Sequence, residues 1–169
     1  MWIEILLLSK LAVEPMHGYE LRKAVEASTG HTLSNNSLYP TLRRFVDAGA
    51  VSRSAEEQEA KPPRHVYTIT EVGRELLHDL LADFPAELAL NEPEFLARVG
   101  NFAWLRPDER TRVLEVRRKA LTAERERLTG LAAGQADPWS RAALQHVLGK
   151  FDAELRWLAE LTTDPREDA

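Results

Sequence analysis

A short helix predicted over residues 36–48 carries side chains that can hydrogen-bond to the edges of nucleic-acid bases. Its apolar face has helical spacing and consists of Leu38, Leu42, Phe45 and Val46. Asn and Arg side chains suit adenine and guanine edges in the major groove, and a helix N-terminus attracts phosphate. The candidate DNA-reading residues on the polar side are Asn35, Asn36, Ser37, Pro40, Arg43 and Arg44. The alternative is an ordinary solvated helix face, with one of residues 34–37 as its N-cap.

A second group of basic side chains lies in a polar stretch between two predicted strands, over residues 54–64. Lys61, Arg64 and His65 fall at its C-terminal end. Basic residues on such a loop can follow the DNA backbone or enter the minor groove. The same loop contains Glu56, Glu57 and Glu59, so a purely solubilising tip is the alternative.

The overall charge of the chain does not favour a nucleic-acid partner. The 169 residues carry a formal net charge of −5, and residues 1–80 hold 9 basic against 11 acidic side chains. Dedicated nucleic-acid binders are often basic. A DNA-binding surface on this chain must therefore depend on a local cluster of positive charge.

The sequence contains no pattern typical of catalysis or of a metal site. There are no cysteines, and the five histidines have no HxxxH or HExxH spacing. Phosphate-binding glycine loops and the GxSxG motif are also absent. We therefore expect no enzyme activity, no cofactor and no metal. No apolar run approaches 18 residues and no secretory signal is recognisable, so we expect a cytoplasmic protein.

The order of predicted elements in the first half is that of a winged helix-turn-helix. Helices are expected over residues 2–13, 17–29 and 36–48, because apolar residues recur at helical spacing and Pro15, Gly30 and Gly49 end the runs. Period-two alternation near Val51 and over residues 65–70 predicts a hairpin. A fourth helix follows, capped by Thr70. The predicted fold is mainly α, with this domain over residues 1–84.

The second half is predicted to be a helical dimerisation domain over residues 85–163, followed by a frayed tail at 164–169. One helix runs from about Pro107 to Leu131 and another begins at Pro138. The second has a coiled-coil-type seam of Leu144, Leu148, Phe151, Leu155 and Leu158. We expect a second subunit to cover part of it. Trp104 and Trp157 are candidates for the wall of a pocket for a planar ligand, or are simply core anchors.

Four sequence blocks within residues 3–81 resemble the PadR family of transcriptional regulators. They are His17-Gly18-Tyr19-Glu20-Leu21, Ser37-Leu38-Tyr39-Pro40, Pro62-Pro63-Arg64 with Tyr67, and the segment 68–75. The resemblance implies a homodimeric, cytoplasmic winged-helix repressor that binds pseudo-palindromic operators. It places Ser37, Tyr39 and Pro40 on the recognition helix, Arg64 on the wing, and Tyr19 near the DNA backbone.

The chain departs from the family pattern at two positions, and these limit what the resemblance implies. Asn35-Asn36 stands where small residues, Gly or Pro are common, and the wing has no glycine. The operator sequence is therefore not implied. Some family members sense phenolic acids or drugs, which suggests a small aromatic effector here. Because the chain is acidic, a winged-helix protein-interaction module without DNA binding is the alternative function.

Overall fold

The computed structural model describes the backbone of residues 1–58 and 61–163 and the side chains of residues 1–55 and 64–162. It divides into two compact units. The first comprises Met1–Leu81 and Ala97–Trp104, and the second comprises Ala82–Leu96 and Leu105–Ala169. Residues 97–104 thus group with the first unit, although the sequence placed all of 85–163 in the second domain. The expected frayed tail at 164–169 lies outside the described residues.

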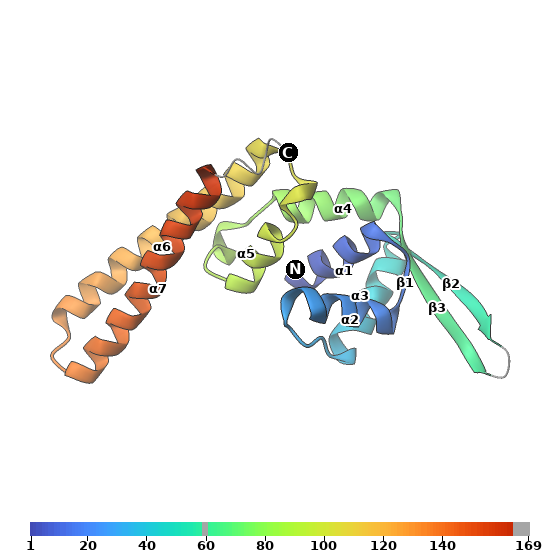
Figure 1. Ribbon diagram of the computed structural model, residues 1–169, viewed down its shortest axis with the longest axis horizontal. Helices are drawn as coiled ribbons and strands as arrows, with labels where there is room; N and C mark the ends of the chain where they lie inside the picture. Colours follow the sequence, from blue (N-terminus) through green and yellow to red (C-terminus); the bar gives the residue numbers. More distant parts are fainter. Residues whose placement is uncertain (59–60, 164–169) are drawn as a thin grey trace. The chain divides into compact units, whose positions relative to one another are not determined.

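Three helices form the core of the first unit (Figure 1). They are α1 (Trp2–Val13), α2 (Gly18–Thr29) and α3 (Asn35–Asp47). Their boundaries agree with the predicted helices to within one residue. The fully or nearly buried side chains are Ile5, Leu6, Leu7, Leu8 and Leu11 of α1, Leu21 and Val25 of α2, and Leu38, Leu42 and Phe45 of α3. The apolar face predicted for the third helix is therefore the buried one.

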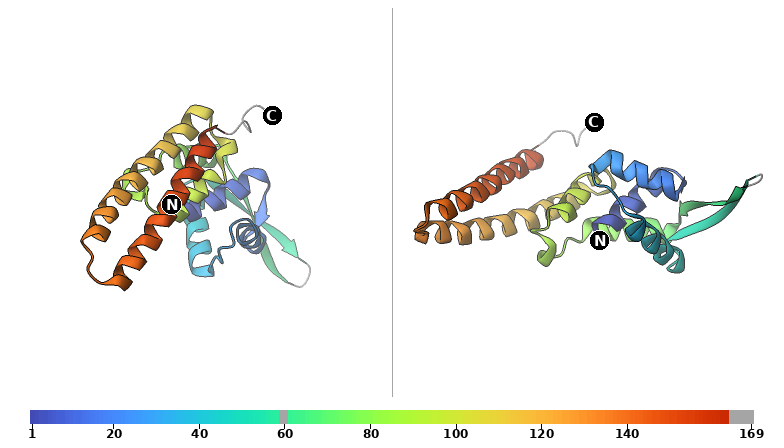
Figure 2. Two further views of the ribbon diagram at one scale, coloured as in Figure 1. Left: turned by 60° about the vertical axis from the view of Figure 1, so that its left-hand side comes forward. Right: turned by 90° about the horizontal axis from the view of Figure 1, so that it is seen from below.

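A three-stranded antiparallel sheet accompanies these helices, with the strand order β1-β3-β2. Its strands are β1 (Met16–His17), β2 (Val51–Gln58) and β3 (Lys61–Ile69). The β2–β3 hairpin projects away from the three helices (Figures 1 and 2). It is longer than predicted, because the polar stretch interpreted as a loop is largely paired strand. The predicted winged helix-turn-helix is confirmed, with β1 as an additional short strand.

Thr70 joins the end of α3, the base of the hairpin and the start of α4 (Glu71–Ala82). Its hydroxyl lies 2.7 Å from the carbonyl oxygen of Gly49 and accepts the N–H of Gly73 at 3.2 Å, as predicted for an N-cap. Gly49 has φ 72°, a left-handed conformation that favours glycine. A Cβ atom at Gly73 would lie 2.1 Å from the carbonyl oxygen of Ala50. The first turn of α4 therefore approaches the backbone of Ala50 too closely for residue 73 to carry a side chain.

Between α4 and Pro107 the chain forms three short elements, η1 (Ala86–Leu88), α5 (Glu92–Val99) and η2 (Phe102–Trp104). None of these three was predicted. The region had been interpreted as a proline-marked break. Asn91 instead caps the N-terminus of α5, since its side-chain oxygen accepts the N–H of Glu94 at 3.2 Å. Proline at position 93 is compatible with this arrangement, because the N–H groups of the first helical turn have no partner within the helix.

The second unit is built on a hairpin of two long helices, α6 (Pro107–Gly134) and α7 (Pro138–Thr163), which lie side by side (Figures 1 and 2). Leu114, Leu121 and Leu128 of α6 are buried, as their seven-residue spacing suggests. In the predicted seam of α7, Leu158 is buried. The other four members, Leu144, Leu148, Phe151 and Leu155, are half-buried. The neighbouring helix thus covers the seam only in part.

A buried arginine connects the elements of this second unit. The Arg117 Nε donates to Glu154 at 2.7 Å, and its Nη1 donates to the carbonyl of Ala89 at 2.6 Å. The guanidinium lies 5.1 Å from the ring centre of Phe95, and Trp157 packs edge-on against the same ring at 6.0 Å. One charged side chain therefore fixes α6 against α7 and the segment that precedes them.

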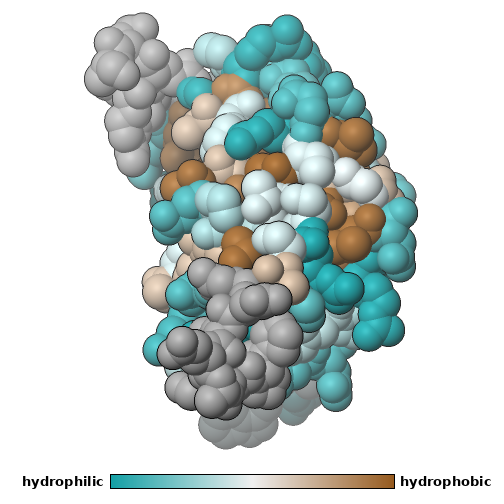
Figure 3. Space-filling model, turned by 90° about the vertical axis from the view of Figure 1, so that its right-hand side faces the viewer, coloured by the Kyte–Doolittle hydropathy of each residue, from teal (hydrophilic) through white to brown (hydrophobic). Residues whose placement is uncertain are grey.

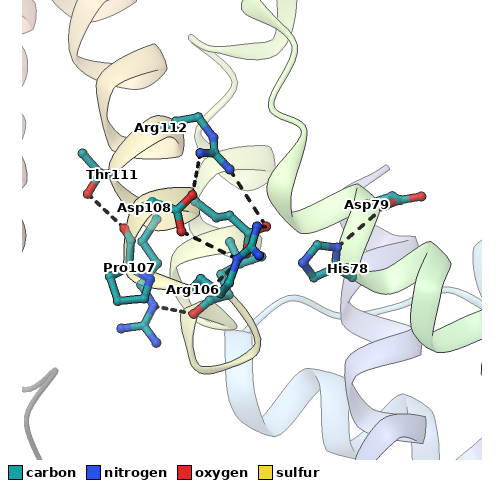
Figure 4. Close-up of polar contacts among 10 residues, drawn as sticks. His78, Asp79, Arg106, Pro107, Asp108, Thr111 and Arg112 are labelled. Atoms are coloured by element: carbon teal, nitrogen blue, oxygen red, sulfur yellow. Dashed lines mark hydrogen bonds and ion pairs between the residues drawn. The ribbon is translucent and has the colours of Figure 1, made fainter.

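Polar contacts around the first turn of α6 stabilise the helix end (Figure 4). Arg112 donates to Asp108 at 2.7 Å, and the hydrogen bond from Arg112 is the main reason that the pKa of Asp108 is lowered. The Thr111 hydroxyl donates to the carbonyl of Pro107 at 3.0 Å. Separately, within α4, His78 Nδ1 lies 3.8 Å from Asp79.

The described part of the chain contains neither a cluster of metal-ligand side chains nor a membrane-spanning helix. No three or more His, Asp or Glu side chains there gather into a group that could hold a metal ion. None of the helices in the described residues is long and apolar enough to cross a membrane.

Candidate nucleic-acid interface

The N-terminus of α3 is capped so that its first residues face solvent. Ser34 is the N-cap, and its hydroxyl accepts the N–H of Ser37 at 3.2 Å. Asn35 and Asn36 follow it and are both exposed. Arg22 of α2 donates to the Asn35 side-chain oxygen at 3.3 Å, which connects the two helices of the helix-turn-helix at this end.

Tyr39 occupies the contact between α3 and the start of α2. A Cβ atom at Gly18 would lie 3.0 Å from Cε1 of Tyr39, so the ring packs directly on the glycine. The Tyr39 side chain nevertheless remains 43% exposed. Its ring is thus held in place while part of it stays accessible to a ligand.

A hollow of about 640 Å³ lies where the N-terminus of α2, α3 and β3 meet. Its lining residues are His17, Gly18, Tyr19, Glu20, Lys23, Tyr39, Arg64, His65 and Tyr67. His17 Nδ1 is 3.1 Å from the carbonyl oxygen of His65, and the backbone N–H of His17 donates to Glu20 at 3.0 Å. The first of these contacts links the start of α2 to β3, and the second is part of the N-terminal cap of α2.

A second hollow of about 470 Å³ adjoins the first on the side of the hairpin. Its lining residues are Tyr39, Arg43, Val46, Asp47, Arg53, His65 and Tyr67, three of which also line the first hollow. Together the two hollows present the cationic side chains of Lys23, Arg43, Arg53 and Arg64 and the carboxylates of Glu20 and Asp47. Positive charge therefore predominates here, although the chain as a whole is acidic.

Tyr67 is the most buried side chain that lines these hollows and the one whose acidity is altered. It is 7% exposed, and burial raises the pKa of its hydroxyl above the usual value. The positive charge of Arg53 and hydrogen bonding by Arg53 oppose this rise. Arg43 opposes it more weakly, and Tyr39 adds to it. Both arginines line the second hollow together with Tyr67.

Hydrophobic residues do not form one continuous surface on the side of the molecule where the hairpin lies. In this view they occur as small patches separated by hydrophilic residues (Figure 3). Interfaces with DNA are more polar than those between proteins. The mixed character of this face is therefore compatible with a nucleic-acid partner.

Comparison with known proteins assigns the part of the chain that carries these hollows. Residues 7–79, from α1 to α4, match the Transcriptional regulator PadR-like family. The chain belongs to this family. The four blocks that suggested it are distributed through the matched region, and residues of the first three line the hollows of the PadR-like domain.

Individual relatives match the PadR-like domain or the whole chain. An uncharacterized 37.1 kDa protein in a Streptomyces fradiae transposon is 39% identical over 74 residues, which are 44% of this chain and 20% of that protein. The chain thus spans a fifth of its length. A Thermoplasma acidophilum protein described as a transcriptional regulator is 35% identical, with 46% of this chain and 74% of that chain covered, and a TM-score of 0.43.

A third similar structure covers both units. Bacillus subtilis PadR, solved in complex with operator DNA, is 19% identical, with 95% of this chain and 96% of that chain covered, and a TM-score of 0.47. The same Bacillus subtilis protein has been solved in complex with p-coumaric acid.

The PadR-like domain brings together five of the eleven predicted DNA-binding residues around the two hollows. These are Tyr19, Tyr39, Arg43, Arg64 and His65. Asn35, Asn36 and Pro40 are exposed on α3, and Ser37 is half-buried. Arg44 lies elsewhere: its guanidinium is ion-paired with Glu4 of α1. Lys61 belongs to β3, and its side chain lies outside the described residues.

The residues predicted for a ligand pocket fall in different parts of the structure. Trp104 belongs to the first unit and is 43% exposed, whereas Trp157 belongs to the second and packs on Phe95. Trp157 is half-buried and contributes to the core of its own unit.

Among the lining residues that sequence reasoning did not predict for the site are Lys23, Arg53 and Tyr67. Lys23 follows Tyr19 by one helical turn, and its ammonium lies 4.6 Å from the Tyr19 ring centre. Arg53 and Tyr67 are direct cross-strand partners. Strand alternation from Val51 places Arg53 on the same side of the hairpin as Val51, just before the polar stretch at residues 54–64, and this signal could have found it.

Proposed function

We propose that this chain is a sequence-specific DNA-binding transcriptional regulator, acting as a homodimeric repressor at its own or a neighbouring promoter. One observation carries the proposal. The exposed polar face of α3 and the basic side of the hairpin border the same two hollows, which share Tyr39. A surface with this arrangement offers base-reading and phosphate-binding groups side by side.

In this proposal α3 enters the major groove, with its N-terminal residues toward the bases. Asn35 and Asn36 offer amide groups suited to adenine, and Arg43 offers a guanidinium suited to guanine or phosphate. Tyr19 and Lys23 at the first hollow, with Arg64 on the hairpin, contact the backbone. These contacts position the protein, and the α3 side chains supply the specificity.

Dimerisation is proposed to occur through the C-terminal helices. The half-buried seam of Leu144, Leu148, Phe151 and Leu155 leaves apolar surface that α6 does not cover. Near the turn between the two helices, Leu131 is 51% exposed and Trp139 is 83% exposed. A second copy would bury such residues and would present two α3 helices to two half-sites of a pseudo-palindromic operator.

The proposal includes release of the DNA by a small ligand. The binding of p-coumaric acid by Bacillus subtilis PadR supports a planar aromatic effector. Because Trp104 and Trp157 belong to different units, each is proposed separately as a contact for it. The proposal predicts that such a compound lowers DNA affinity and quenches tryptophan fluorescence.

The proposal is tested by binding of the full chain to the DNA immediately upstream of its own gene and of the adjacent genes. Fluorescence anisotropy and footprinting should reveal a protected inverted repeat, with affinity that falls steeply as salt increases. A scrambled duplex of the same composition is the control for specificity. Sedimentation of the complex should give two chains per duplex.

Failure to bind any of these duplexes at low salt would contradict the proposal and favour a winged-helix module that binds proteins. Equal affinity for the scrambled and upstream duplexes would contradict the sequence-specific part of it.

A further inference from the structure

Arg53 stands at a position that the sequence did not mark and that the family resemblance does not include. It lies on β2 and is exposed, and its cross-strand partner is Tyr67 on β3. Directly paired residues of an antiparallel ladder project to the same face. Both residues line the second hollow, together with Arg43 and Asp47 of α3. The lining of the hollow thus contains two guanidinium groups, one from the helix and one from the hairpin.

The chemistry of this hollow suits a phosphate group. A guanidinium presents several N–H donors in a planar fork that matches phosphate oxygens. The two arginines outweigh the single carboxylate of Asp47. Tyr39, which also lines the hollow, adds an accessible phenol.

Tyr67 gives the long, exposed side chain of Arg53 a fixed partner. Tyr67 is buried in the domain, is the direct cross-strand partner of Arg53 and lines the same hollow, and the charge of Arg53 lowers the pKa of its hydroxyl against the effect of burial. An arginine whose conformation is restricted before binding loses less side-chain entropy when it meets a ligand. Tyr67 therefore restrains Arg53 without having to contact the ligand itself.

We propose that Arg53 is a phosphate-binding residue for the DNA backbone, that it acts across the second hollow from Arg43, and that Tyr67 is its positioning residue. The proposal rests on the proposed DNA-binding function and adds to it a residue pair at the base of the hairpin. The backbone segment next to α3 would lie between the two arginines.

The test measures how the affinity of the full chain for a 30-base-pair duplex of random sequence depends on salt. Random-sequence DNA is sufficient because a phosphate contact does not require the operator. Each lost contact makes the slope of log affinity against log salt less steep by about 0.9. When salt rises from 50 to 200 mM, the affinity of both proteins falls. The factor by which the affinity of Arg53→Gln falls should be about 3.5 times smaller than the factor for the wild type.

The variants separate the contact from its positioning. Arg53→Lys keeps the charge and should keep the wild-type slope. Tyr67→Phe should weaken binding, and adding it to Arg53→Gln should cause no further loss. Arg156→Gln, at an exposed arginine of α7, is the matched control and should leave both slope and affinity unchanged. Circular dichroism melts establish that each variant is folded.

The proposal is overturned if Arg53→Gln has the wild-type slope, or if the effects of Arg53→Gln and Tyr67→Phe on affinity are additive. If the wild type does not bind the duplex at all, the proposed DNA-binding function fails as well. Binding by the wild type with an unaltered slope in Arg53→Gln overturns only the assignment of Arg53.

Discussion

The ring of Tyr39 packs directly on Gly18, so that a Cβ at residue 18 would lie 3.0 Å from Cε1 and 3.3 Å from the hydroxyl oxygen of Tyr39. The two residues belong to α3 and to the start of α2. Because Gly18 has no side chain, the Tyr39 ring can pack against it and line the first hollow, as Lys23 and Arg64 also do. The glycine thus determines where the phenol is presented.

Gly18→Ala should weaken DNA binding more than it weakens the fold. The added methyl group must push the Tyr39 ring by a few tenths of an ångström, and this ring is partly exposed and can move. We expect the free energy of unfolding to change by less than about 1 kcal/mol while DNA affinity falls. Chemical denaturation and anisotropy titrations measure the two quantities. Unchanged affinity would mean that the position of Tyr39 does not matter for binding.

Gly73→Ala should destabilise the first unit. Its Cβ would meet the backbone oxygen of Ala50 at 2.1 Å, and backbone cannot move aside as a flexible side chain can. We expect a loss of about 2 kcal/mol or more in urea unfolding. Gly130→Ala in α6 is the control, because no atom lies within 4 Å of its added Cβ. That variant should gain about 0.5–1 kcal/mol from helix propensity.

Arg43 and Arg44 should differ in their contribution to DNA binding although they are neighbours. Arg43 lines the second hollow, whereas Arg44 is ion-paired with Glu4. Arg43→Ala should cost about 1–3 kcal/mol of binding free energy, and Arg44→Ala should cost less than about 1 kcal/mol. Anisotropy titrations on the upstream duplex compare them. Equal losses would contradict the separation of the two side chains.

Stability should fall at alkaline pH because of Tyr67. Its pKa is raised above 10.0 in the folded chain, chiefly by burial, so the folded state retains its proton more strongly than the unfolded state. The resulting stabilisation is complete below pH 10 and is lost as the pH rises through the folded-state pKa. Urea unfolding between pH 9 and about 11 should show a smaller decrease for Tyr67→Phe than for the wild type. Identical pH profiles would contradict the assignment.

Breaking the ion pair between α6 and α7 should destabilise the second unit. Glu154→Gln leaves the buried guanidinium of Arg117 without its carboxylate partner, at a cost of about 3 kcal/mol. Replacing both residues with apolar ones, as Arg117→Met with Glu154→Leu, should recover most of that loss. Thermal and urea unfolding of the three proteins test this. A double variant less stable than Glu154→Gln would contradict the explanation.

The helices of the first unit could be predicted because their signals are local. The boundaries of α1 follow from the spacing of Ile3, Leu6, Leu7 and Leu11 and from Pro15. Pro93 is a local signal that misleads. The sequence predicts a break in the helical pattern there, but the structure places this proline in the first turn of α5. The two-residue strand β1 is too short to show alternation, and it exists only because β3 pairs with it.

The exposed face of α3 was predicted from that helix alone, whereas Arg53 was missed although the neighbouring strand supplies its partner. The apolar spacing of α3 predicts which face of the helix is exposed. It therefore predicts that Asn36 and Arg43 face solvent, as the structure shows. The same face included Arg44, whose partner Glu4 lies 40 residues away and leaves no local signal. Arg53 was missed because its importance comes from its pairing with Tyr67 across the hairpin.

Thr70 fastens the base of the β2–β3 hairpin to the end of α3 and to the beginning of α4. These hydrogen bonds join the Thr70 hydroxyl to backbone groups of Gly49 and Gly73 and involve no side chain of the hairpin. Exposed hairpin side chains such as Ser54 are consequently free to diverge in evolution, or to be exchanged by an engineer, while α3 keeps its orientation. The fold separates a constant reading element from an interchangeable one.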